Sequence, residues 1–127
     1  MPHIRIEYPR ALAQIVDLAA FCEHMRKVMA DIPAFPVAGI RIRAHAADAT
    51  ATADGRPFLF AHLEVIIGRG RDDATRAGIV ETLYTAAETY LKPLIGERPF
   101  ALSLEIRETT VFSEKRWNTY NAALADA

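Results

Sequence analysis

The chain has 127 residues and a net charge of −1, with 51% hydrophobic and 24% charged residues. These values suit a single globular domain over residues 1–127 and provide no basic field for nucleic acid. The single cysteine, Cys22, excludes an intrachain disulfide and a cysteine-based zinc site. Neither a signal peptide pattern nor an apolar run of about 18 residues is present, so a cytoplasmic location is expected.

The amino terminus is the first informative feature, because proline follows the initiator methionine. If Met1 is removed, Pro2 begins the chain with a secondary amine that accepts a proton. An α-amino group titrates near pH ~8, and burial and nearby cations tune such a group into a general base. The strand predicted directly after it, over residues 3–8, would hold this terminus in place.

The first half of the chain predicts a strand, a helix and a second strand. Pro9 interrupts the first strand, and a helix follows over about residues 14–31. Prolines 33 and 36 separate this helix from an alternating strand over residues 40–46, and Asp54-Gly55 marks a turn. The apolar face of the helix comprises Leu18, Phe21, Cys22, Met25, Val28, Met29 and Ile32. Cys22 is therefore expected to pack in the core.

The second half repeats this order. A strand over residues 58–67 leads into the loop at 68–71, and Asp72 or Asp73 can cap the next helix. This helix is predicted to run to about Leu91 and to end at Lys92-Pro93 and Gly96. A strand over residues 100–108 follows, and residues 114–124 suggest a short terminal helix. The apolar stripe of the long helix is Ala77, Val80, Leu83, Tyr84, Ala87 and Leu91.

Together these elements predict an α+β fold built from two β-α-β units. The long connections favour parallel pairing within each unit, giving a four-stranded mixed sheet with two helices on one face. The predicted core face carries Ile4, Ile6, Ile40, Ile42, Leu59, Leu63, Val65, Leu102, Leu104 and Ile106. The other face carries His3, Arg5, Glu7, Arg41, Arg43, His45, His62, Glu64, Ser103, Glu105 and Arg107, with Phe58, Phe60 and Ile66. That face meets either solvent or another subunit, and the periodicity favours neither.

Four arginines are candidate anion-binding residues. Arg41 and Arg43 share a strand face, while Arg69 and Arg71 flank Gly70 just before a helix amino terminus. A guanidinium binds a carboxylate bidentately, and a helix amino terminus favours an anion. Cations near Pro2 would also disfavour its protonated form. Solvated loop residues and interface ion pairs remain the alternative interpretation.

Other catalytic motifs are weak or missing. His3, His45 and His62 share one sheet face, but no metal-binding spacing accompanies them, so interface or supporting roles are favoured. The sequence contains no Gly-x-Ser-x-Gly element, and the glycines at 68 and 70 form neither a P-loop nor a Rossmann fingerprint. Phe35 with Pro36 suggests either a pocket wall or core packing.

Seven features of the chain form a recognisable set: the Met-Pro-His start, residues 35–43, His45, Asp48, the turn at 53–55, the Gly-Arg-Gly-Arg loop at 68–71 and the strand at 102–106. Together they resemble the 5-carboxymethyl-2-hydroxymuconate isomerase family of the tautomerase superfamily. The similarity spans nearly the whole chain. It implies a tautomerase-like homotrimer of β-α-β-β-α-β subunits that uses no cofactor and no metal.

The resemblance also implies an activity and its residues. The family reaction is a C=C-transposing ketonisation of an unsaturated 2-hydroxy polyacid in homoprotocatechuate and wider aromatic catabolism. Pro2 would be the general base and later the acid, Arg41 would bind or polarise the 2-hydroxy-carboxylate end, and Arg71 would bind a carboxylate or the developing oxyanion. Arg43 and Phe35 would contact substrate. The alternatives are a tautomerase of another enol acid, such as phenylpyruvate, and a non-catalytic ligand-binding or assembly module.

Overall fold

The computed structural model describes residues 1–109 and 115–125. Its main elements, in chain order, are β1 (His3–Pro9), η1 (Arg10–Gln14), α1 (Leu18–Ala30), η2 (Val37–Gly39), β2 (Arg41–Ala47), β3 (Leu59–Ile67), α2 (Asp73–Ile95), β4 (Phe100–Glu108) and α3 (Tyr120–Ala125). Both β-α-β units are present, and the strand boundaries lie within one residue of those predicted. Of the predicted terminal helix, residue 114 lies outside the described residues and only Tyr120–Ala125 is helical.

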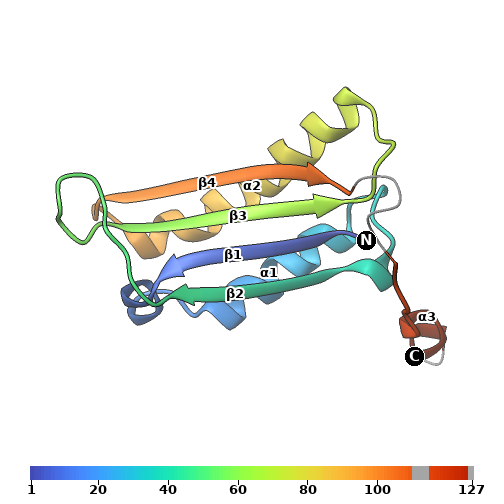
Figure 1. Ribbon diagram of the computed structural model, residues 1–127, viewed down its shortest axis with the longest axis horizontal. Helices are drawn as coiled ribbons and strands as arrows, with labels where there is room; N and C mark the ends of the chain where they lie inside the picture. The colour runs from blue at the N-terminus through green and yellow to red at the C-terminus, as the bar shows by residue number, and fades with distance from the viewer. Residues whose placement is uncertain (110–114, 126–127) are drawn as a thin grey trace.

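The four strands form one mixed sheet in the order β2-β1-β3-β4 (Figure 1). β1 is parallel to β2 and β3 is parallel to β4, while β1 and β3 pair antiparallel at the centre. In this register Ile4 lies between Ile42 and Val65. The predicted mixed α+β sheet is therefore confirmed, including parallel pairing within each unit.

The two long helices cover one face of this sheet (Figure 1). Ile4, Leu63 and Val65 from the central strands are fully buried against Phe21 and Met25 of α1, within a single apolar cluster that also includes α2. Burial of this apolar area is the main favourable contribution to folding. Cys22 is half-buried and packs against the cluster, as expected, and burial raises the pKa of its thiol.

The first helix begins later than predicted. Residues 10–14 form a 3-10 helix, and α1 starts at Leu18 because Asp17 caps it: the carboxylate of Asp17 accepts a hydrogen bond from the Ala20 amide at 3.1 Å. An aspartate that satisfies a free amide in this way favours a helix start over a helix interior.

The second helix extends further than predicted. α2 continues through Pro93 to Ile95 and ends at Gly96, whose φ of 62° suits glycine. Proline removes one intrahelical hydrogen bond, but burial of Ile95 in the core favours completing the last turn. The buried stripe of α2 also differs from the one predicted, because Ile79 is buried and Ala77 is exposed. It comprises Ile79, Leu83, Ala87, Leu91 and Ile95.

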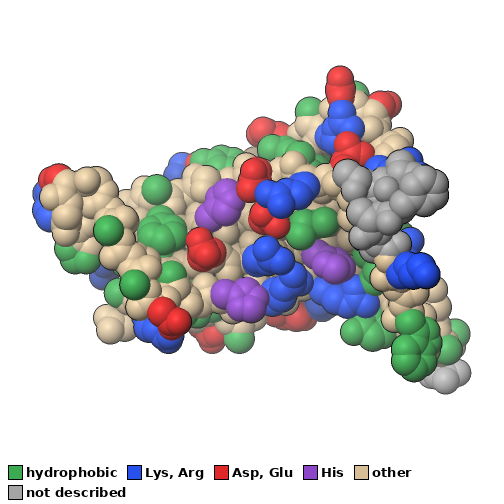
Figure 2. Space-filling view, in the orientation of Figure 1, with side chains coloured by type: hydrophobic (Ala, Val, Ile, Leu, Met, Phe, Trp, Pro, Cys, Tyr) green, Lys and Arg blue, Asp and Glu red, His purple; other side chains and the backbone are tan. Residues whose placement is uncertain are grey.

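The sheet face opposite the helices is charged (Figure 2). Glu64 is only 14% exposed there and forms ion pairs with Arg5 at 3.6 Å and Arg107 at 3.1 Å. His62 contacts Ser103 at 2.6 Å and Glu105 at 3.3 Å. We call this surface the open face. Several of its charged side chains form ion pairs with one another within one chain.

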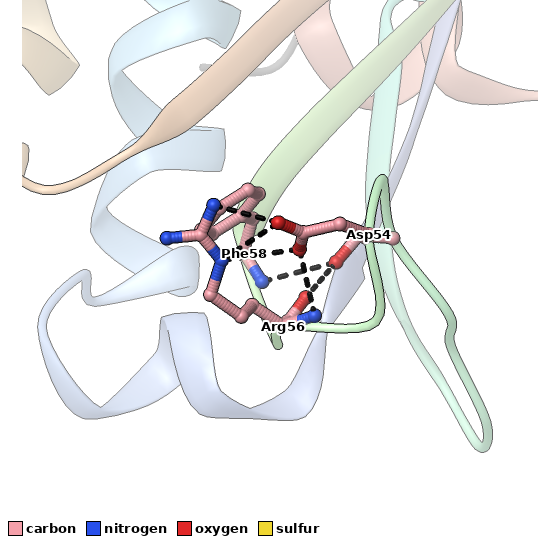
Figure 3. Close-up of polar contacts among 4 residues, drawn as sticks. Asp54, Arg56 and Phe58 are labelled. Atoms are coloured by element: carbon pink, nitrogen blue, oxygen red, sulfur yellow. Dashed lines mark hydrogen bonds and ion pairs between the residues drawn. The ribbon is translucent and has the colours of Figure 1, made fainter.

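The connection between β2 and β3 projects beyond the sheet (Figure 1). Its turn contains Asp54, whose carboxylate binds the Arg56 side chain. The Arg56 guanidinium in turn lies 4.7 Å from the ring centre of Phe58 (Figure 3). The predicted Asp54-Gly55 turn is thus present, at the end of the sheet remote from the amino terminus. Within the described residues, no helix combines the length and apolarity needed to cross a membrane.

We predict that Leu63→Ala lowers the free energy of unfolding by about 2–5 kcal/mol, because this fully buried side chain leaves a cavity in the central strand. Leu94→Ala, at a position that is 40% exposed, is the control and should change stability far less. Denaturant unfolding at one protein concentration measures both. Equal losses in the two variants would contradict the assigned core.

Candidate active site

Pro2 is buried at the start of β1, and the backbone holds it from two sides. The Arg41 amide donates a hydrogen bond to the Pro2 carbonyl at 3.2 Å, which extends the parallel pairing of β1 and β2. Gly39 lies against the proline ring so closely that a Cβ atom at Gly39 would be 2.7 Å from Pro2 Cδ. The position of the proline is therefore determined by two elements that sequence places almost 40 residues later.

Pro2 borders a cavity of about 570 Å³ at the end of the sheet. The wall is built by the amino terminus, the segment before η2, the loop after β3 and the carboxy-terminal segment. Among the described residues, its charged members are three arginines and no carboxylate. The lining comprises Met1, Pro2, Ala34, Phe35, Pro36, Ile67, Gly68, Arg69, Arg71, Thr109 and Arg116. Such a cavity favours an anionic ligand.

Arg71 is the most constrained of these arginines. One of its Nη atoms donates to the Ala34 carbonyl at 2.6 Å, which fixes the guanidinium against the segment before η2. Its Nε is buried and has no hydrogen-bond partner within the described part of the chain. A buried donor without an acceptor is costly, so this N–H favours binding of an anion.

The loop carrying Arg69 and Arg71 leads directly into α2. The Asp72 side chain, one of the two predicted caps, caps this helix by accepting from the Thr75 amide at 2.8 Å. Hydrogen bonding from Thr75 holds the pKa of Asp72 below its ordinary value. Gly70 adopts a φ of 101°, a conformation that favours glycine and turns the chain between the two arginines.

The predicted site residues do not all line this cavity. Pro2, Arg71 and Phe35 come together there, and Phe35 is only 5% exposed, so it serves both the core and the cavity wall. Arg41 lies outside the lining: its guanidinium is 3.1 Å from His3 Nε2 and 5.0 Å from the ring centre of Tyr120. Arg43 lies on the open face and is paired in register with Arg5.

Met1 connects Arg41 to the cavity. Its side chain lines the cavity, and its Sδ is 3.7 Å from an Nη of Arg41. Met1 therefore contacts both the Arg41 guanidinium and the cavity, and its peptide bond occupies the proline nitrogen.

Sequence reasoning missed Arg116. It lines the cavity because the Asn118 side chain donates to the Ala38 carbonyl at 2.8 Å, which holds the carboxy-terminal segment beside η2. No motif surrounds Arg116, and the contact that holds its segment joins residues 80 positions apart, so no local pattern pointed to it. In the part of the chain that the structure describes, no group of three or more acidic, histidine or cysteine residues is placed to bind a metal ion.

We predict opposite effects for two glycine substitutions. Gly39→Ala should lower the free energy of unfolding by about 1–3 kcal/mol, because the new methyl group must displace Pro2. Gly78→Ala should raise it by about 0.5–1 kcal/mol, because this α2 position has open space around it and alanine favours helix. Thermal and denaturant unfolding measure both, and a stabilising Gly39→Ala substitution would contradict the close approach to Pro2.

Comparison with known proteins supports an isomerase. The family model described as 5-carboxymethyl-2-hydroxymuconate isomerase matches residues 2–124. A 5-carboxymethyl-2-hydroxymuconate Delta-isomerase of Escherichia coli is 33% identical over 109 residues, covering 85% of this chain and 86% of that protein.

Solved structures give the same result. A crystal structure of a 5-carboxymethyl-2-hydroxymuconate delta-isomerase has a TM-score of 0.91 at 28% identity and covers 98% of this chain and 93% of its own. The corresponding isomerase from Deinococcus radiodurans R1 has a TM-score of 0.87 at 28% identity, covering 97% and 93%. A fused 4-OT wild-type symmetric trimer shares the fold, with a TM-score of 0.65 at 15% identity and coverage of 85% and 87%. The family model and the Escherichia coli relative show that the chain belongs to the 5-carboxymethyl-2-hydroxymuconate isomerase family, and the first two solved structures agree.

Proposed function

We propose that this protein ketonises 5-carboxymethyl-2-hydroxymuconate, an unsaturated 2-hydroxy polyacid, with the Pro2 amine as the general base. The observation that carries the proposal is the buried proline in an arginine-lined cavity, beside an Arg71 Nε that has no acceptor among the described residues. The family match supports the same reaction. We place this reaction in aromatic catabolism as part of the proposal.

Removal of Met1 is the activating step in this proposal. Cleavage frees the Pro2 nitrogen, and the same cleavage removes the side chain that contacts Arg41 and lines the cavity. A basic amine and a further guanidinium then face one space. Neighbouring cations favour the neutral form of an amine, which is the form that accepts a proton.

The reaction needs only proton transfer. Pro2 takes the proton from the 2-hydroxyl group, the O–H electrons form the C=O bond, and the conjugated double bond shifts along the chain. The proline then returns the proton to a remote carbon, so a C–H bond replaces the O–H bond with no change in oxidation state. Positioned guanidiniums stabilise the dienolate between these steps.

In this proposal, each arginine binds a different part of the polyacid. Arg71 binds a carboxylate or the developing oxyanion through its Nε, and Arg41 binds or polarises the 2-hydroxy-carboxylate end. Arg69 and Arg116 supply positive charge for the remaining carboxylates. Phe35 forms the apolar wall beside Pro2, and Arg43, remote from the cavity within one chain, contributes only through the assembly.

We further propose that the chain, as one domain over residues 1–127, forms a homotrimer through its open face. The fused 4-OT trimer that shares this fold supports oligomerisation. Both helices are on the other side of the sheet, which leaves the open face, with Arg41 and Arg43, accessible to another subunit.

We predict that Pro2→Ala lowers kcat by about 10²-fold or more in Met1-free protein, because a general base commonly contributes 10²–10⁴-fold. Loss of the dienol ultraviolet absorbance, corrected for spontaneous ketonisation, measures the rate. Intact mass establishes that Met1 is absent from both samples. Wild-type turnover in a folded Pro2→Ala variant would contradict the role of Pro2.

We predict that Arg116→Gln raises KM for the polyacid by about tenfold and leaves the tautomerisation of phenylpyruvate within about twofold, because only the polyacid has carboxylates left for this residue. Arg10→Gln, at the opposite end of β1, removes the same charge and is the control. Phenylpyruvate as the faster wild-type substrate would favour the second candidate, a tautomerase of simple enol acids.

A further inference from the structure

Arg76 is an unusual residue for its position, in the first turn of α2. A cation there opposes the partial positive charge of the helix amino terminus, so its presence requires compensating partners. The structure provides them: Arg76 forms ion pairs with Asp73, three residues earlier, and with Glu108 at the end of β4. Its Nη1 also donates to the Arg71 carbonyl at 2.9 Å.

Glu108 is the carboxylate that lies against the anion-binding loop. One of its oxygens accepts from Arg76 and the other accepts from the Gly70 amide at 3.0 Å. Gly70 lies between two cavity arginines, and Thr109, which follows Glu108, lines the cavity. The Arg76 and Glu108 side chains are only 30% and 26% exposed, so solvent screens their charges incompletely.

Without Arg76, the negative charge of Glu108 would weaken the binding of anions in the cavity. An uncompensated Glu108 would repel an anionic substrate and compete with it for the guanidiniums of Arg69 and Arg71. Arg76 thus does two things: it neutralises Glu108, and it ties the Arg71 backbone to the same carboxylate that holds Gly70.

We propose that Arg76 is a positioning residue that masks Glu108 and holds the loop at residues 68–71, so that the Arg71 guanidinium remains available to substrate carboxylates. The inference rests on the proposed polyacid substrate and adds a residue that does not touch it. It makes the Arg76–Glu108 pair a determinant of affinity for polyanions.

The test is a double-mutant cycle at this pair in Met1-free protein. Arg76→Ala should raise KM for 5-carboxymethyl-2-hydroxymuconate by about tenfold or more, because it exposes an unpaired carboxylate to the substrate. Glu108→Gln, which keeps an acceptor for the Gly70 amide, should change KM by less than about threefold. The double variant should regain most of the affinity that Arg76→Ala loses, since the unmasked charge is gone.

Two controls separate charge masking from a general loss of structure. The same cycle at Arg10 and Asp48, an exposed ion pair, should leave KM unchanged. Phenylpyruvate should show a smaller KM change in Arg76→Ala than the polyacid does, whereas a loosened fold would affect both. A KM in the double variant as high as in Arg76→Ala, or higher, would overturn the inference.

Calorimetric binding of citrate distinguishes this inference from the proposed function. If the wild type lacks ketonisation activity but binds citrate, and Arg76→Ala weakens that binding with rescue in the double variant, the function fails and the masking role stands. If the wild type turns over substrate and the cycle shows no rescue, the function stands and the masking role fails. If the wild type neither ketonises the substrate nor binds citrate, the cavity is not an anion site, and both the proposed function and the masking role are overturned.

Discussion

The placement of the amino terminus depends on the close approach of two backbone segments, the start of β1 and the segment leading into β2. The Arg41 amide binds the Pro2 carbonyl, and Gly39 approaches the proline ring without a side chain between them. An unsupported terminus samples many conformations, and ordering it costs conformational entropy. Here the hydrogen bonds between β1 and β2 offset the entropy lost on ordering the terminus, and they hold Pro2 in one position beside the cavity.

The cavity lining brings three arginines together, and their mutual repulsion is unfavourable unless hydrogen-bond acceptors or negative charges compensate for it. Arg69, Arg71 and Arg116 share one lining, with no carboxylate among the described lining residues. The structure offsets this at the periphery: the Ala34 carbonyl accepts from Arg71, and Glu108 binds the loop through Gly70 and Arg76. The site therefore remains attractive to anions while the loop that carries the arginines is held by neutral or paired groups.

The open face follows a different electrostatic arrangement. Glu64 is nearly buried between Arg5 and Arg107, and His62 bridges Ser103 and Glu105, so several charges are already paired within one subunit. A paired polar face buries at lower cost than isolated charges would, because each ion keeps a partner when water leaves. This arrangement is compatible with association through the sheet.

The sequence alone determined the elements and their order. The alternation over residues 40–46 specified a strand, because successive side chains of a strand point to opposite faces. Of the two predicted caps, Asp72 and Asp73, the structure has Asp72, whereas the first helix starts at Leu18 and the second continues past Pro93. Those boundaries were wrong because a local cap and burial of Ile95 outweighed the patterns used to place them. Pro2 and Arg71, which both line the cavity, were also singled out by local signals, a Met-Pro start and two arginines that flank a glycine.

Tertiary structure decided which of the arginines face the proline. Arg41 and Arg71 carry the same side chain, yet only Arg71 lines the cavity, because the β1–β2 register directs Arg41 to the open face behind Met1. Arg116 enters the site through a hydrogen bond between Asn118 and Ala38, 80 residues apart. The pairing of Arg76 with Glu108 likewise joins α2 to the end of β4. Such contacts depend on where elements that are far apart in the sequence meet in space, and local periodicity contains no information about that arrangement.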